Sequence, residues 1–266
     1  MKKWAIFDRL AIVFFNLFLL LLSIMLPAVS IASSPAFYQA QFEKTGIYAS
    51  VDSDGNQVRK TIRYIDGKST QYAQFSDEQL DEIIDHIVSY LFTDQESFAL
   101  TMDGVCLNGT TQDGVSVFGE VACKHMVDVK ELFSLVVIVT VVMGVLLLGL
   151  GGYLIWRRKQ IAPLLLKYSL IFYGVFFALV GAFCGWVAID AAATKNAFAD
   201  QMWTNIHHLF FPFQADEFAG SFFNATLTSV LTLDFFLNAV STVLIVMGIT
   251  LVLWFSATIV CKKLSK

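Results

Sequence analysis

The sequence predicts a mainly α-helical protein with four transmembrane helices and an extracellular α+β cap between helices one and two. Hydrophobic residues make up 56% of the 266 residues, and the mean hydropathy is +0.65. These residues are concentrated in four runs without a charged side chain, and a polar stretch, residues 33–131, separates the first two runs. Ordinary soluble domains are less apolar, so that class is excluded.

Each of the four apolar runs is longer than twenty residues. About twenty residues of helix cross a hydrocarbon core about 30 Å thick, and none of the runs alternates like a barrel strand. The expected helices are Leu10–Ala32, Leu132–Trp156, Tyr168–Ile189 and Phe235–Val260. A cleaved signal peptide is the alternative for the first run, which has a basic start and a small-residue end. Its apolar part is long for that role, so we expect it to be retained.

The basic residues predict the orientation in the membrane. Ten of the 18 basic residues, but only one of the 22 acidic residues, lie before run one, between runs two and three, or after run four. The positive-inside rule therefore predicts cytoplasmic termini and places the acidic residues outside. No further basic tract suggests a nucleic-acid partner. The expected segments are 1–32 (cytoplasmic N-terminus and helix one), 33–131 (extracellular cap), 132–192 (helices two and three with a short basic cytoplasmic loop), 193–234 (aromatic-rich extracellular interfacial segment) and 235–266 (helix four and basic cytoplasmic tail).

The cap sequence predicts strands followed by a helix. Residues 47–75 contain extended stretches and Gly- and Asp-rich turns, which favour one or two hairpins. Ser76 and Gln79 form a capping-box pattern before a segment with apolar residues at helical spacing. Residues 115–118 are expected to form a short strand, and the chain is expected to be helical from Glu120 into helix two.

Two cysteines lie in the cap. Cys106 and Cys123 are placed on the side of the membrane where disulfides form, so they are expected either to pair or to remain two free thiols. Of the other two, Cys184 lies inside the third apolar run and Cys261 at the cytoplasmic end of the fourth, so neither is expected to reach the pair in the cap.

All four histidines lie outside the expected helices and on the outer side. His86 is expected to be a solvated residue of the cap helix. His125 lies where the cap enters helix two, and Asp128 shares its helical face at the i, i+3 spacing. A carboxylate beside an imidazole suits general-base chemistry, although an interfacial histidine is the plainer interpretation. His207 and His208 lie in the aromatic-rich segment, on the same side of the membrane as His125.

Two short motifs resemble those of a known family. The runs HMVDVK at 125–130 and HHLFF at 207–211, with the four-helix layout, resemble the lipoprotein intramolecular transacylases (Lit) of Gram-positive bacteria. The resemblance implies a cell-membrane enzyme without cofactor or metal, and no phosphate-binding loop or metal-ligand cluster is present in the sequence. Its partners would be a diacylated lipoprotein and membrane lipid. The enzyme would move the sn-2 acyl chain of a diacylglyceryl-cysteine to that cysteine's own α-amine, giving the lyso form.

The resemblance also assigns roles to residues. His207 is expected to be the base and His125 the acid or oxyanion stabiliser, or the reverse. Asp128 and Lys130 would support them. The substrate would be folded in an aromatic pocket made by Trp203, Phe210, Phe211 and Phe213.

Two other functions compete with this interpretation. One is a non-enzymatic membrane sensor or scaffold whose cap binds a ligand. The other is a transporter or channel, which is disfavoured because the expected helices carry almost no ionisable residues at membrane depth.

Overall fold

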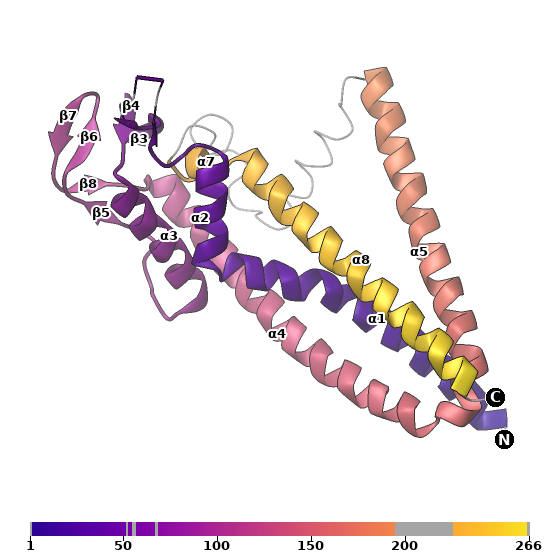
Figure 1. The fold of residues 1–266 in the computed structure, drawn as a ribbon. Helices are drawn as coiled ribbons and strands as arrows, with labels where there is room; N and C mark the ends of the chain where they lie inside the picture. Colours follow the sequence, from indigo (N-terminus) through magenta and orange to yellow (C-terminus); the bar gives the residue numbers. More distant parts are fainter. Residues whose placement is uncertain (1, 52, 55–56, 67–68, 195–225, 265–266) are drawn as a thin grey trace. The chain divides into compact units, whose positions relative to one another are not determined.

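Four long helices dominate the computed structural model, which describes residues 2–51, 53–54, 57–66, 69–194 and 226–264 (Figure 1). All four are long and apolar enough to cross a membrane, which confirms the four expected transmembrane helices. They are α1 (Lys2–Ala32), α4 (Glu120–Trp156), α5 (Arg158–Thr194) and α8 (Leu233–Leu264).

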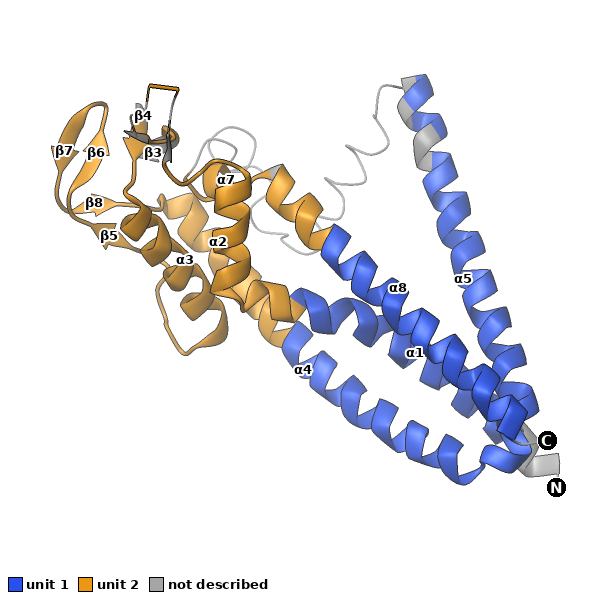
Figure 2. Ribbon diagram, viewed as in Figure 1, with its two compact units in different colours: residues 1–28, 136–206, 241–266 blue, residues 29–135, 207–240 orange. Residues whose placement is uncertain are grey.

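The chain forms two compact units, coloured separately in Figure 2. The first comprises residues 1–28, 136–206 and 241–266 and is called the helical unit here. The second comprises residues 29–135 and 207–240 and is called the cap unit.

One end of the helical unit is held together by an apolar cluster that all four long helices share. Its buried members are Ala11, Ile12, Phe15, Leu154, Ile161 and Leu165, with Trp254 and Cys261 packed against them. The starts of α1 and α5 and the ends of α4 and α8 therefore lie at this same end. The buried carboxylate of Asp8 lies here too, bonded by the Tyr153 hydroxyl at 2.6 Å and by Arg157 at 3.1 Å.

The basic loop expected between helices two and three is replaced by helix. Arg157 alone forms a turn, and α5 begins at Arg158 and continues through Pro163. Pro163 is the sixth residue of α5, where an ordinary residue would donate its amide to the Lys159 carbonyl, so the helix continues with that one backbone bond missing. The expectation of a loop was wrong because polar residues can extend a transmembrane helix beyond the hydrocarbon.

A buried asparagine joins three helices of the helical unit. Asn16 of α1 is fully buried, and its Oδ1 accepts a hydrogen bond from the Trp254 indole of α8 at 2.8 Å. Its backbone oxygen accepts from the Tyr173 hydroxyl of α5 at 3.2 Å, and its Nδ2 donates to the Ile12 carbonyl at 2.7 Å. Such bonds satisfy polar groups where water cannot reach them.

Replacing this asparagine is expected to weaken the helical unit. In Asn16→Ala the Trp254 indole loses its acceptor, and the free energy of unfolding should fall by about 1–3 kcal/mol. Thermal unfolding in detergent measures the loss. Thr250→Ala is the control, because that hydroxyl donates within its own helix to the Val246 carbonyl. In a Trp254→Phe background the effect should shrink, and an unchanged effect would show that the bond is unimportant.

The cap unit contains two helices and several short strands ahead of α4. The elements are α2 (Pro35–Lys44), β1 (Ser50–Val51), β2 (Gln57–Val58), β3 (Ile62–Asp66), β4 (Ser69–Gln74), α3 (Asp77–Phe92), β5 (Thr101–Met102), β6 (Val105–Leu107), β7 (Thr110–Gln112), β8 (Val115–Ser116) and, near its end, α7 (Thr226–Val230). The strands pair antiparallel as β1-β2, β3-β4-β6-β7 and β5-β8. Helix α7 packs against β3.

The local signals explain most of these elements. The Ser76–Gln79 capping box is present at the start of α3, and its apolar stripe is buried, as predicted. Strands β3 and β4 form an expected hairpin, and β8 and the start of α4 at Glu120 also agree with prediction. Helix α2 was missed, although Ser34 caps it and Pro35 occupies its first position, which is a helix-start signal.

The hairpins after α3 depend on two Asp-Gly pairs. Gly104 and Gly114 have φ of +69° and +68°, a conformation that side chains rarely adopt. The Gly104 amide donates to Asp113, and the Gly114 amide donates to Asp103, both at 2.8 Å. These reciprocal bonds pin the two turns to each other. Strands β5, β6 and β7 were not predicted, because strands of two or three residues carry too little pattern.

Candidate functional site

His125 lies on the buried face of the first turns of α4. Its side chain is 8% exposed, and the neighbouring Ala122 and Met126 belong to the apolar core of the cap unit. The helix turns this face inward because Ala122, Met126 and Val129 recur at helical spacing. The histidine is therefore enclosed rather than lying on an open surface. Asp128 follows one turn later and is half-buried.

Lys130 of α4 binds backbone carbonyl oxygens at the end of α3 and just after it. Its ammonium donates to the carbonyl oxygens of Thr93 at 2.8 Å and Gln95 at 2.6 Å, and it lies 4.6 Å from the centre of the Tyr90 ring. Thr93 is the C-cap residue of α3, and Gln95 lies in the loop after it. A lysine near the C-terminus of a helix supplies hydrogen bonds to unpaired carbonyls and a charge opposite to that of the helix end. Lys130 thus ties α4 to the end of α3 and to the loop that follows it.

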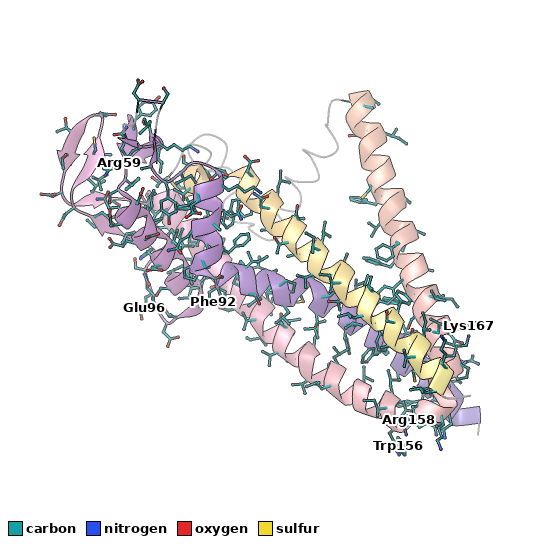
Figure 3. All side chains as sticks on the ribbon, viewed as in Figure 1. Arg59, Phe92, Glu96, Trp156, Arg158 and Lys167 are labelled. Carbon is teal, nitrogen blue, oxygen red and sulfur yellow. The ribbon has the colours of Figure 1, made fainter. Side chains whose placement is uncertain are left out.

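The loop after α3 is organised around the same contact. Phe92, labelled in Figure 3 with the nearby Glu96, packs against Phe133 of α4 with ring centres 6.1 Å apart. Gln95 donates to the Ser97 carbonyl at 2.9 Å, and its amide nitrogen lies 3.4 Å from Nδ1 of His86. The loop and α4 are therefore joined by both polar and aromatic contacts.

His86 is not the solvated residue that the sequence predicted. Its Nε2 lies 3.0 Å from the Phe98 carbonyl, and its ring stacks on Phe118 with centres 6.1 Å apart. The expectation failed because the non-strand residues Phe98 and Phe118, which follow α3 in the chain, pack against this histidine and leave it half-buried. We therefore interpret His86 as a structural residue of the cap unit.

The role of Lys130 gives a prediction. Lys130→Met should lower the free energy of unfolding by about 1–2 kcal/mol, because two carbonyls lose a charged donor. Thermal unfolding and acyl-transfer assays at several pH values would measure the effect. Lys130→Arg should recover most of the stability, and the pH profile of the remaining activity should keep its shape. Lost activity at unchanged stability would instead place the ammonium in the chemistry.

Cys106 and Cys123 are both free thiols in the structure. Cys106 lies in β6 and pairs with Thr111 and Gln74 on the neighbouring strands. Cys123 lies on α4, with its Sγ 3.9 Å from the Phe118 carbonyl. The two are held by different elements, a sheet and a helix, and their pairing stays a prediction.

The remaining expected site residues lie outside the described part of the chain. They are Trp203, His207, His208, Phe210, Phe211 and Phe213. The convergence of His125 and His207 stays a prediction, as does the aromatic pocket.

Two buried polar residues were not identified from the sequence. Gln41 of α2 is 9% exposed and Thr226 at the start of α7 is 2% exposed. Within the described residues of the cap unit, they and His125 are the buried polar side chains. The only sequence signal for Gln41 is its position between the apolar Tyr38 and Phe42 on one helical face. Within the described residues, no group of three or more metal-ligating side chains occurs.

Comparison with known proteins adds two findings. The family model described as "Lipoprotein intramolecular transacylase Lit" matches residues 10–236. Two structures of the membrane integral lipoprotein intramolecular transacylase Lit from Bacillus cereus have the same fold. The first has a TM-score of 0.61 at 14% identity and covers 97% of both chains. The second, a histidine-to-alanine variant, has a TM-score of 0.60 at 16% identity and covers 99% of this chain and 94% of the other. No curated protein sequence matches significantly.

Proposed function

This chain belongs to the lipoprotein intramolecular transacylase family Lit, and we propose that it converts diacylated lipoproteins to their lyso form. It is a multi-pass membrane acyltransferase that carries out intramolecular transacylation of lipoproteins. In the proposed reaction, the sn-2 acyl chain of the N-terminal diacylglyceryl-cysteine moves to the α-amine of the same cysteine.

The proposed topology places both termini in the cytoplasm and the cap outside. The positive-inside rule supports this topology, because ten of the 18 basic residues lie before the first apolar run, between the second and third runs, or after the fourth run. The packing of the helical unit independently supports placing both termini on the same side, because the starts of α1 and α5 and the ends of α4 and α8 lie together. The segments 1–32, 33–131, 132–192, 193–234 and 235–266 remain the proposed division along the chain.

The proposed chemistry requires one proton to move from nitrogen to oxygen. The α-amine has an ordinary pKa of about 8 and must lose a proton before it attacks the ester carbonyl. The tetrahedral intermediate then breaks its C–O bond, and the glyceryl oxygen takes up a proton as the amide forms. Two histidines suit these steps, with His207 as base and His125 as acid or oxyanion stabiliser, and the roles can be exchanged. Asp128 would orient His125.

The burial of His125 is the observation that carries this proposal. The enclosed surroundings of this imidazole exclude water, which would otherwise hydrolyse the ester. Because the amine and the ester belong to one molecule, holding them together supplies much of the rate, and effective molarities can reach about 10⁵ M or more. Trp203, Phe210, Phe211 and Phe213 would fold the lipid into that geometry.

Mass spectrometry tests the proposal directly. The chain is expressed in a host that makes only diacyl lipoproteins, and an N-terminal lipopeptide is fragmented. The transfer is an isomerisation, so the mass of the intact lipopeptide should stay the same while fragments place one acyl chain on nitrogen. An increase in mass by one acyl chain would indicate transfer from a second lipid. Acyl chains that stay on the glyceryl oxygens would refute the proposal.

A further inference from the structure

The core of the cap unit is apolar except at three positions. Within its described residues, the buried polar side chains are Gln41, His125 and Thr226, which are 9%, 8% and 2% exposed. They come from α2, α4 and α7, three elements far apart in the sequence. Three segments therefore each bring one polar side chain into a core made otherwise of aliphatic and aromatic groups.

Two of these side chains carry a buried oxygen that needs a hydrogen-bond partner. Gln41 Oε1 and Thr226 Oγ1 have none among the described residues. Nearly all buried polar atoms in proteins are hydrogen-bonded, and each exception needs an explanation. Leaving such an oxygen unpaired destabilises a fold, whereas a methionine or a valine of similar size would fit an apolar core without that cost.

The three positions border the same core. Tyr38 and Phe42 flank Gln41, Leu227 follows Thr226, and Met126 follows His125, and all four flanking residues belong to one cluster of buried side chains. Tyr38 also packs on Phe235 of α8, with ring centres 5.0 Å apart, which joins α2 to the segment that follows α7.

We propose that Gln41 and Thr226 bind the polar head of the lipoprotein substrate in the core that His125 borders. This inference rests on the proposed function. The head of a diacylglyceryl-cysteine offers N–H donors on its amine and carbonyl acceptors on its esters. A carboxamide oxygen accepts a hydrogen bond, and a threonine hydroxyl donates one. Gln41 Oε1 therefore receives the amine N–H, and the Thr226 hydroxyl donates to an ester carbonyl oxygen.

This arrangement explains why polar groups are kept where apolar ones would stabilise the fold. Both oxygens are paired when the substrate is bound, and they hold the amine and the ester in place. Stability is sacrificed in the empty protein for interactions with the substrate, a trade-off that occurs at many binding sites.

The proposal can be tested because removing either polar side chain should keep or increase stability while it lowers activity. Gln41→Met and Thr226→Val remove the polar atoms at similar volume. Each is expected to leave the melting temperature in detergent unchanged or raised, and to lower kcat/KM for a diacyl lipopeptide by about tenfold, since each loses one buried hydrogen bond to the substrate. The matched controls are Gln112→Met and Thr111→Val, the same changes at exposed positions of β7, which should alter neither quantity.

The remaining outcomes count against the inference. A lower melting temperature for a variant shows that its polar atom is bonded within the protein, and overturns the substrate role of that residue. An unchanged kcat/KM overturns it as well. A wild-type protein that forms no N-acyl product refutes the proposed function and the inference with it, and this result is distinct because it requires no variant.

Discussion

His125→Ala is expected to lower the rate of lyso-lipoprotein formation by about a hundredfold to ten-thousandfold. That range is the usual contribution of a positioned acid or base, and here the leaving glyceryl oxygen would have to depart without its proton donor. His125 is buried on α4 beside Ala122 and Met126, so solvent cannot readily replace it. The rate is measured from the N-acylated fragment of a lipopeptide over time.

The alanine variant also removes volume from a packed core, so a second variant is needed. His125→Gln fills most of the space and can still hydrogen-bond, but it cannot transfer a proton near neutral pH. It should fold with a melting temperature close to that of the wild type and be as inactive as His125→Ala. Val127→Ala, on the exposed side of the same helix turn, is the control. Normal turnover in His125→Gln would exclude proton transfer by this residue.

The second large loss of activity is expected when His207 is substituted, and the neighbouring His208 provides the comparison. His207→Ala should reduce the rate by a similar factor, about a hundredfold or more, because the substrate amine then lacks its base. His208→Ala changes the same residue type one position along and should retain activity within a few fold. Equal losses in the two variants, or a loss confined to His208→Ala, would contradict the assignment.

Combining the two substitutions tests whether both histidines serve one reaction. Residues that act as a unit in catalysis give non-additive losses. The variant carrying both His125→Ala and His207→Ala should therefore be about as slow as the slower single variant. A loss equal to the product of the two single losses would indicate that the histidines act independently.

The sequence predicted the structure best where interactions within a short stretch of chain determine it. Membrane helices satisfy their own backbone, so their length and apolar composition are enough to locate them. The capping box at Ser76 and Gln79 likewise acts within one turn, and it is present as predicted. Family membership rests on a model that matches residues 10–236, in agreement with the resemblance noted in two short motifs.

Prediction failed where a residue's environment comes from distant parts of the chain. His86 was expected in solvent, but the segment carrying Phe98 and Phe118 covers it. Helix α2 was missed, and Gln41 with it, because ten residues of mixed polarity give a weak periodic signal.

The sequence by itself determined the four membrane helices and identified the candidate histidines, because composition and short motifs act locally. The orientation of the helices stays a prediction from the basic residues. The tertiary structure decided which polar groups are enclosed. Lys130 reaches carbonyls more than thirty positions earlier, and Gln41, His125 and Thr226 enter one core from three separate elements. Burial depends on which segments pack together, and long-range packing has no signature in any single stretch of residues.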